Sequence, residues 1–326
     1  MGTAIRTGRG SRLAFGIEAS GSWGTEVART VTTNLVSVSL QRHAEDVPLQ
    51  HLMGTTGTGR ALADSYQSIE RVSGDVVNTA GYEGSMLGFL LKAALGSSAD
   101  SGAGPYTHTI TLSDAAPPSF SAELVRGMEN GAADITEEFY GLMCQSFELD
   151  AQPGKAVQIR TSWVGKTGGA RAAAGTIPAL DTLFPILHRH AGQLGFNGNN
   201  YTIASFKLKV DNKLVTDLQE LGSLYVTEPP VGGFAEIMVE AEVVLRSQQL
   251  YTDHMAQTPA DLTLTFTDST RSLAITAHNC KITAYDDGIS DAGPIKAKVT
   301  WRAYSAASES GVSCVLINSK ATTALS

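Results

Sequence analysis

The sequence predicts a mainly β protein with many turns. Its 326 residues include 33 Gly together with many Thr and Ser, and few segments show a helical period. Residues 205–211 and 235–246 alternate polar and apolar side chains with period two, and residues 295–303 do the same. A strand with one buried face and one solvent face gives this pattern. The solvent face of the second stretch is acidic.

Composition limits the classes of protein that fit. The chain is long enough for one large or two ordinary domains, and 42% hydrophobic content can fill their cores. The net charge of −8 argues against general DNA coating, which uses a basic surface. The longest apolar stretch, residues 86–95, is too short to span a membrane, and no secretory signal is expected. Cys144, Cys280 and Cys314 are expected to be buried free thiols.

The clearest helix is predicted over residues 85–95, where Ser85 can cap the start and Gly96 can close the end. Residues 43–60 are expected to form a long polar loop, residues 248–259 a short helix or loop, and residues 305–326 a tail of small residues. The strands expected elsewhere cover residues 35–40, 68–78, 106–112, 262–267, 272–276, 281–285 and 295–303.

Two acidic, strand-rich blocks suggest a duplicated β unit. The first covers residues 119–164 and the second residues 205–246, with a Gly- and Ala-rich connector between them. The second contains six acids and no Lys or Arg between residues 217 and 242. The resulting division is an N-terminal arm (1–30), a first β unit (31–165), a connector (166–200), a second β unit (201–305) and a C-terminal tail (306–326).

Motifs for catalysis, cofactors or metals are not expected in this chain. Gly165-Lys166-Thr167 lacks the preceding Gly and the following helix of a phosphate-binding loop. His188 and His190 could share one face of a strand, but they have no third metal ligand at close spacing. The acids of the two blocks could include a hydrolase pair, although regular alternation along a strand more simply gives a solvent face. A structural protein fits better than an enzyme.

Several motifs, in order, resemble those of phage tail tube (major tail) proteins. The N-terminal ones are Arg12-Leu13-Ala14-Phe15, Glu18 and Trp23-Gly24-Thr25. Those that follow are Gly74, Gly84 with the helix to Gly96, Tyr106-Thr107-His108-Thr109, Pro118-Ser119-Phe120-Ser121, Phe139-Tyr140-Gly141 and Phe206-Lys207-Leu208-Lys209-Val210-Asp211-Asn212. A terminal β-hairpin completes the series, so the resemblance covers about residues 12–303.

The resemblance implies a tail-tube-like β-sandwich or barrel with a flanking helix, duplicated in tandem. It also implies a virion protein, made in the host cytoplasm, whose stacked rings form a tube for DNA ejection. Its partners would be further copies of itself, tail terminator, baseplate and tape-measure proteins, and DNA in non-specific passage, with no cofactor. The alternatives are a carbohydrate-binding or carbohydrate-cleaving β domain, and another ring protein of the tail or baseplate.

Three further expectations concern assembly. Two similar units per chain favour a ring of three copies with pseudo-sixfold symmetry, and six copies remain the alternative. The basic arm, with Arg6, Arg9 and Arg12, and the loop at residues 43–60 are expected to contact neighbouring rings. The acids expected to face the lumen, where they would form a negative wall that repels DNA, are Glu148, Asp150, Glu236, Glu240 and Glu242.

Overall fold

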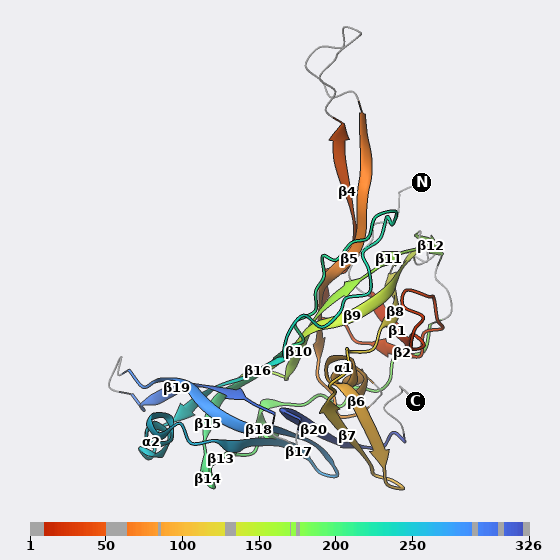
Figure 1. Ribbon diagram of the computed structural model, residues 1–326. Helices are drawn as coiled ribbons and strands as arrows, with labels where there is room; N and C mark the ends of the chain where they lie inside the picture. The colour runs from red at the N-terminus through yellow and green to blue at the C-terminus, as the bar shows by residue number, and fades with distance from the viewer. Residues whose placement is uncertain are drawn as a thin grey trace.

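The computed structural model describes residues 10–49, 64–83, 86–127, 135–169, 171–173, 177–288, 293–305 and 310–321. Antiparallel β-strands dominate this part of the chain, as Figure 1 shows. The helices in it are α1 (Met86–Leu95) and α2 (Gln249–Ala256), with one 3-10 turn, η1 (His188–His190). The predicted mainly β fold is confirmed.

The strands of the first half are β1 (Arg12–Ile17), β2 (Val31–Thr33), β3 (Ser37–Val38), β4 (Gln41–Leu49), β5 (Asp64–Thr79), β6 (Gly96–Ser101), β7 (Tyr106–Leu112), β8 (Phe120–Arg126), β9 (Ile135–Ala151), β10 (Gln158–Gly165), β11 (Thr167–Gly168) and β12 (Ala172–Ala173). Those of the second half are β13 (Leu194–Phe196), β14 (Asn199–Tyr201), β15 (Ile203–Asp211), β16 (Glu236–Val244), β17 (Ala260–Asp268), β18 (Arg271–Asp286), β19 (Lys296–Ala303) and β20 (Val312–Asn318).

One sheet, called here the long sheet, runs through both halves of the chain. Its order is β4–β5–β10–β9–β15–β16–β19–β18, with β3 beside β5 on the same side as β4. The halves join where β9 pairs with β15, in a register that sets Leu208 opposite Leu149. Because this ladder crosses the join, the two halves share one continuous sheet.

Two further sheets flank the long sheet. The first has the order β2–β1–β8–β9, with β11 and β12 on the far side of β9. The second has the order β14–β13–β17–β18–β20–β7–β6. The strands β9 and β18 contain 17 and 16 residues, and each begins in a flanking sheet and ends in the long sheet. These two strands therefore tie the layers together around the core.

The same strand order occurs twice in the long sheet. In the first half it is β4–β5–β10–β9, and in the second half β15–β16–β19–β18. The strands β10 and β19 contain 8 residues each, with buried Trp163 and Trp301 at the same place in both. The ladder to the neighbouring long strand is bulged beside each Trp. A helix follows the hairpin in both halves. The exact domain boundaries remain a prediction.

The two acidic blocks compared in the sequence are not counterparts in this order. Residues 119–164 contain β8, β9 and β10, whose counterparts are β17, β18 and β19. Residues 205–246 contain the hairpin β15–β16, whose counterpart is β4–β5. The blocks were matched by acidic content, and acids on a solvent face are free to vary. The buried Trp of β10 and β19 is the more informative signal.

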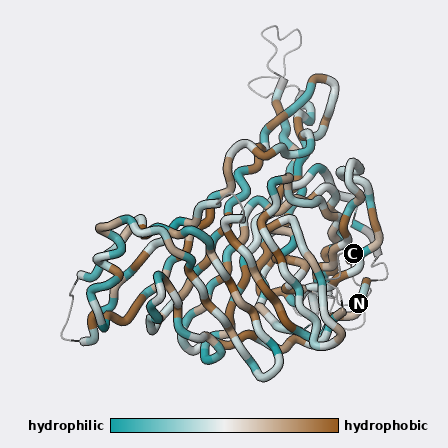
Figure 2. Tube along the Cα trace, turned by 60° about the horizontal axis from the view of Figure 1, so that its bottom comes forward, coloured by the Kyte–Doolittle hydropathy of each residue, from teal (hydrophilic) through white to brown (hydrophobic). Residues whose placement is uncertain are grey.

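Helix α1 is confirmed from Met86 to Leu95, and all its residues except Lys92 are buried. Phe89 packs against Phe15 and Phe120, with ring centroids 5.1 and 4.9 Å apart. The helix ends at Leu95, and the next residue, Gly96, has a φ of 90°, which favours glycine. Residue 85, the expected cap, lies outside the described residues. Figure 2 shows hydrophobic and hydrophilic residues alternating along the strands around this core.

Two segments predicted to be irregular contain strands. Residues 43–49 belong to β4, which pairs with β5 in a hairpin that projects from the body (Figure 1). The rest of the predicted loop, residues 50–60, lies outside the described residues. Within the predicted tail, β20 pairs with β18 and β7, and it buries Cys314 and Leu316. The apolar residues Val315 and Ile317 on its half-buried face concealed its alternation.

Candidate functional site and assembly surfaces

The five acids predicted to line a lumen lie on one face of the long sheet, called here the charged face. Glu148 and Asp150 lie on β9, and Glu236, Glu240 and Glu242 on β16. The alternate residues of these strands point into the core, as the burial of Leu149, Val239 and Ala241 shows. The register places all five on the same side because both β9 and β16 pair with β15.

Basic residues from neighbouring strands lie among these acids. They share the face by direct pairing across the ladders: Arg160, Lys207, Lys209, Lys296, Lys298 and Arg302. Lys207 Nζ lies 3.0 Å from Glu148, Lys296 Nζ lies 3.5 Å from Glu242, and Arg302 lies 2.5 Å from Glu236. The charged face is therefore mixed in charge, not the negative wall expected from the sequence. The bases were missed because the acids were counted along single strands, whereas these bases lie on the paired strands β10, β15 and β19.

The hairpin β4–β5 forms a projecting arm. The β4 side chains at residues 41–46 are exposed, and Tyr66 on β5 is 51% exposed. A two-stranded hairpin that is solvated on both faces is marginal by itself. The arm therefore has the character of a contact element.

A buried carboxylate anchors the base of this arm. The side chain of Glu70 is 1% exposed, and Arg42 Nη2 donates a hydrogen bond to its Oε2 at 2.6 Å. The hydroxyl of Thr167 donates to its other oxygen. The backbone N–H of Glu70 also donates to the carbonyl of Leu224 at 2.9 Å. One residue thus connects β4, β5, β11 and the loop at residues 212–235.

The hydrogen bonds decide the ionisation of Glu70. Burial by itself would raise the pKa of this carboxyl, but the hydrogen bonds from Arg42 and Thr167 and the charge of Arg42 hold the pKa below its usual value. The same contact raises the pKa of the Arg42 guanidinium. The pair is therefore ionised at neutral pH, and the arm base depends on that charge.

A second buried carboxylate, Glu18, joins segments of the tail-tube-like motifs. Its Oε2 accepts from the backbone N–H of Gly24 at 2.8 Å and from the Ser119 hydroxyl at 2.9 Å. Its Oε1 accepts from the Ser121 hydroxyl at 2.9 Å and from the backbone N–H of Gly141 at 2.8 Å. Glu18 is only 4% exposed. The sequence showed these motifs in order, but not that one carboxylate connects them.

Lys166 links the turn held by Glu18 to the loop at residues 212–235. Trp23 Nε1 donates to the Gly141 carbonyl at 2.9 Å. Lys166 Nζ lies 5.1 Å from the ring centroid of Trp23 and 6.0 Å from that of Tyr225. Since Tyr225 forms a bridge with Glu70, the N-terminal turn and the arm base are parts of one contact network.

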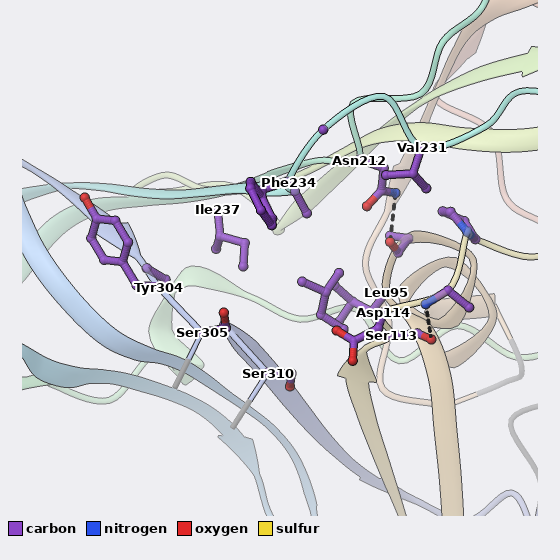
Figure 3. Close-up of a pocket in the computed structure, with 18 of the residues that line it drawn as sticks. Leu95, Ser113, Asp114, Asn212, Val231, Phe234, Ile237, Tyr304, Ser305 and Ser310 are labelled. Atoms are coloured by element: carbon purple, nitrogen blue, oxygen red, sulfur yellow. Dashed lines mark hydrogen bonds between the residues drawn. The ribbon is translucent and has the colours of Figure 1, made fainter. Parts of the chain in front are cut away.

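A pocket of about 840 Å³ lies between the end of α1 and the edges of β16 and β19 (Figure 3). Asn212 lines the pocket, and its side-chain amide donates a hydrogen bond to the carbonyl of Ala94 at 2.9 Å. Most lining residues are small or apolar, with Asp114 and Arg302 as charged members, and Phe234 at its rim is fully exposed. This lining suits a contact surface better than a reaction site.

The remaining site predictions have separate outcomes. Arg12 begins β1 and pairs with Val125, whereas Arg6 and Arg9 lie outside the described residues. His188 and His190 form η1, and no cluster of three or more His, Cys, Asp or Glu suited to a metal occurs among the described residues. In the same part of the chain, no helix has the length and apolarity to cross a membrane.

Exposed aromatic side chains do not form a carbohydrate platform in the described structure. They lie on separate elements: Tyr66 on the arm, Phe184 in the connector, Phe234 in the loop before β16, Tyr251 on α2 and Tyr304 after β19. A carbohydrate-binding face was expected to gather them on one sheet. The arrangement gives no support to that alternative.

The continuous sheet, the projecting arm and the buried carboxylates that position it are features of a structural protein. Residues 8–303 match the family model described as phage tail tube protein. The chain belongs to this family, and it is a structural component of a phage tail. No curated protein matches the sequence.

Proposed function

We propose that copies of this chain assemble into rings, and that stacked rings form the tube through which phage DNA is ejected. The observation that carries the proposal is the long sheet, which is continuous through the chain. Within the described residues, the strand at each end of this sheet is paired on one side only. Open strand edges favour association, and closure into a ring satisfies them. Membership of the tail tube family supports the same conclusion. The role is structural, without catalysis or cofactor.

A ring of three copies is proposed, with six copies as the alternative. Each chain presents the same order of four strands twice, so three chains would give six similar units around the axis. Native mass spectrometry of isolated rings tests this number. A mass of three chains supports it, and a mass of six chains contradicts it.

The charged face is proposed to line the lumen. Its interleaved charges give DNA neither a continuous basic track to bind nor a uniform repelling wall, so phosphates would find no sustained site of counterion release. Replacing Glu236, Glu240 and Glu242 with Lys would make the face strongly basic and should slow DNA passage, most visibly at low salt. Normal ejection by this variant, or a map that places the face outside, would refute the assignment.

The arm and the N-terminal basic segment are proposed to contact the adjacent ring. The arm projects from the body and exposes both faces, which a neighbouring ring would cover (Figure 1). Deleting residues 1–10 should leave soluble rings and shorten or abolish tubes. Tubes of unchanged length and thermal stability would remove the support for this contact. Tail terminator, baseplate and tape-measure proteins are the further partners proposed at the tube's ends and in its lumen.

A further inference from the structure

Each end of the long sheet has a strand with a pairing partner on one side only, within the described residues. At one end, β3 and the first residues of β4 pair with β5. At the other, residues 281–286 of β18 pair with β19, after the earlier part of β18 has left the flanking sheet. These are the two edges open to another chain.

The join between β9 and β15 shows how two such edges fit within one chain. In the repeated strand order, β15 corresponds to β3–β4, and buried Leu208 corresponds to buried Leu40. The last part of β9 corresponds to the last part of β18, and Phe147 corresponds to Tyr285. The internal join is therefore a template for the contact between copies.

We propose that the end of β18 in one copy pairs antiparallel with the β3–β4 edge of the next copy, in the register of the β9–β15 join. In that join, Lys209 faces Glu148 and Val210 faces Phe147. The corresponding pairs between copies are Gln41 with Asp286, and Arg42 with Tyr285. The inference rests on the proposed ring assembly and adds which edges meet and in which register.

At the internal join and at the outer edge of β18, a side-chain nitrogen close to a strand carbonyl marks where pairing with another strand can begin. Within the chain, the Asn212 side chain donates to the carbonyl of Cys144 at 2.9 Å, and pairing with β15 begins two residues later, at Ser146. At the outer edge, the counterpart carbonyl of Ile282 lies 3.1 Å from Gln257 Nε2, and 3.1 Å from His254 Nδ1 on α2. Helix α2 thus closes the edge as far as Ile282 and leaves the following residues open.

The charges of the two edges are complementary. The exposed base at the β3–β4 edge is Arg71, which lies on β5 opposite His43 and beside Gln41. The β18 edge carries Asp286, the proposed partner of Gln41, which is also exposed. Opposite charges across an interface fix register and disfavour incorrect pairings. This complementarity favours a second copy of the chain as the partner of the edge.

The test is disulfide cross-linking of the Gln41→Cys, Asp286→Cys variant in assembled protein. Residues that face each other in an antiparallel pair have Cα atoms about 4.5–5.5 Å apart, within the range that a disulfide bridges. Cys144, Cys280 and Cys314 are buried, and burial raises the pKa of the Cys280 thiol to about 12, so the introduced thiols are the accessible ones. Oxidation should produce species of two and three chains that reduction removes.

Two matched variants control the register. Lys209→Cys with Glu148→Cys, at the internal join, should close within one chain without increasing its mass. Gln41→Cys with Lys281→Cys shifts one partner by five residues, about 17 Å along the strand, and should not cross-link.

Rings of normal mass without the Gln41–Asp286 link, or with an equally efficient link in the shifted pair, would overturn the inference. A wild-type chain that stays monomeric by mass would overturn the ring assembly itself. Mass measurement before oxidation therefore separates the two failures.

Discussion

Replacing Glu18 with Gln should destabilise the protein strongly while barely changing side-chain volume. Glu18 receives four hydrogen bonds in a site that is 4% exposed. Glutamine replaces one acceptor oxygen with an NH₂ donor. The Ser119 and Ser121 hydroxyls can rotate to accept from this group, but the backbone N–H groups of Gly24 and Gly141 cannot. One buried N–H is therefore left without its acceptor.

The expected loss is about 4 kcal/mol. An unsatisfied buried donor costs about 1–3 kcal/mol, and each remaining bond loses about 1 kcal/mol when the acceptor is no longer charged. Because a domain is stable by only about 5–15 kcal/mol, this is a large fraction of the total. The Trp23 turn should loosen before the core, since Gly24 lies in that turn.

Calorimetry of unassembled protein checks the value, with Glu240→Gln as the matched control. Glu240 is exposed on the charged face, and its substitution should change stability by less than about 0.5 kcal/mol. Glu18→Gln should lower the midpoint of thermal unfolding by roughly 10 °C relative to that control. Equal midpoints for the two variants would show that the Glu18 hydrogen bonds do not stabilise this turn as argued.

Three other changes test other parts of the structure. The pKa of Glu70 is lowered in the folded protein, so its stabilising contribution is present above the usual carboxyl pKa of about 4.3 and is lost as the pH falls through the folded pKa. Glu70→Gln should therefore reduce the loss of stability at acid pH. An unchanged dependence of stability on pH in that range would contradict this. Gly141→Ala should cost about 3 kcal/mol of stability, because the φ of Gly141 is 69° and the new Cβ would lie 2.8 Å from Trp23 Nε1. Gly154→Ala, at a φ of 76° with no atom within 4 Å of the new Cβ, should cost only about 1 kcal/mol. Equal losses for the two variants in chemical denaturation would show that the clash with Trp23 does not destabilise the protein. Leu208→Ala, at the join of the halves, should cost about 2–5 kcal/mol by the same measurement, and a loss below about 1 kcal/mol would show that the join is not packed as described.

The positions of strands, and which of their side chains point into the core, could be predicted where polar and apolar residues alternate regularly. Residues 106–112 are the strand β7 as predicted, and residues 295–303 match β19 within one residue. Helix α1 was predictable from a continuous apolar run between a potential cap and a glycine. In each case the local sequence determines which side chains are buried, and burial dominates the choice of structure.

Features that depend on pairing between distant segments could not be predicted. The bases of the charged face lie on β10, β15 and β19, so an acid count along one strand gave the wrong electrostatic picture. Strand β20 carries apolar residues on both of its faces, and its place between β18 and β7 provides its stability. Glu18 lies in a recognisable motif, but three of its four donors, Ser119, Ser121 and Gly141, are more than 100 residues away.

The repeat shows the same limit in another form. Acidic composition paired the wrong blocks, whereas the tryptophans of β10 and β19 occupy the same place in two strands of equal length. A buried Trp beside a bulge is fixed by packing and backbone geometry, which a duplicated fold retains. Surface acids carry no such constraint.

The most direct test of tube formation is cryo-electron microscopy of the purified protein over a range of concentrations. The expected result is hollow tubes built from rings of three chains, with the long sheet continuous around each ring and the charged face toward the lumen. A protein that remains monomeric at every concentration, or tubes in which the charged face points outward, would contradict it.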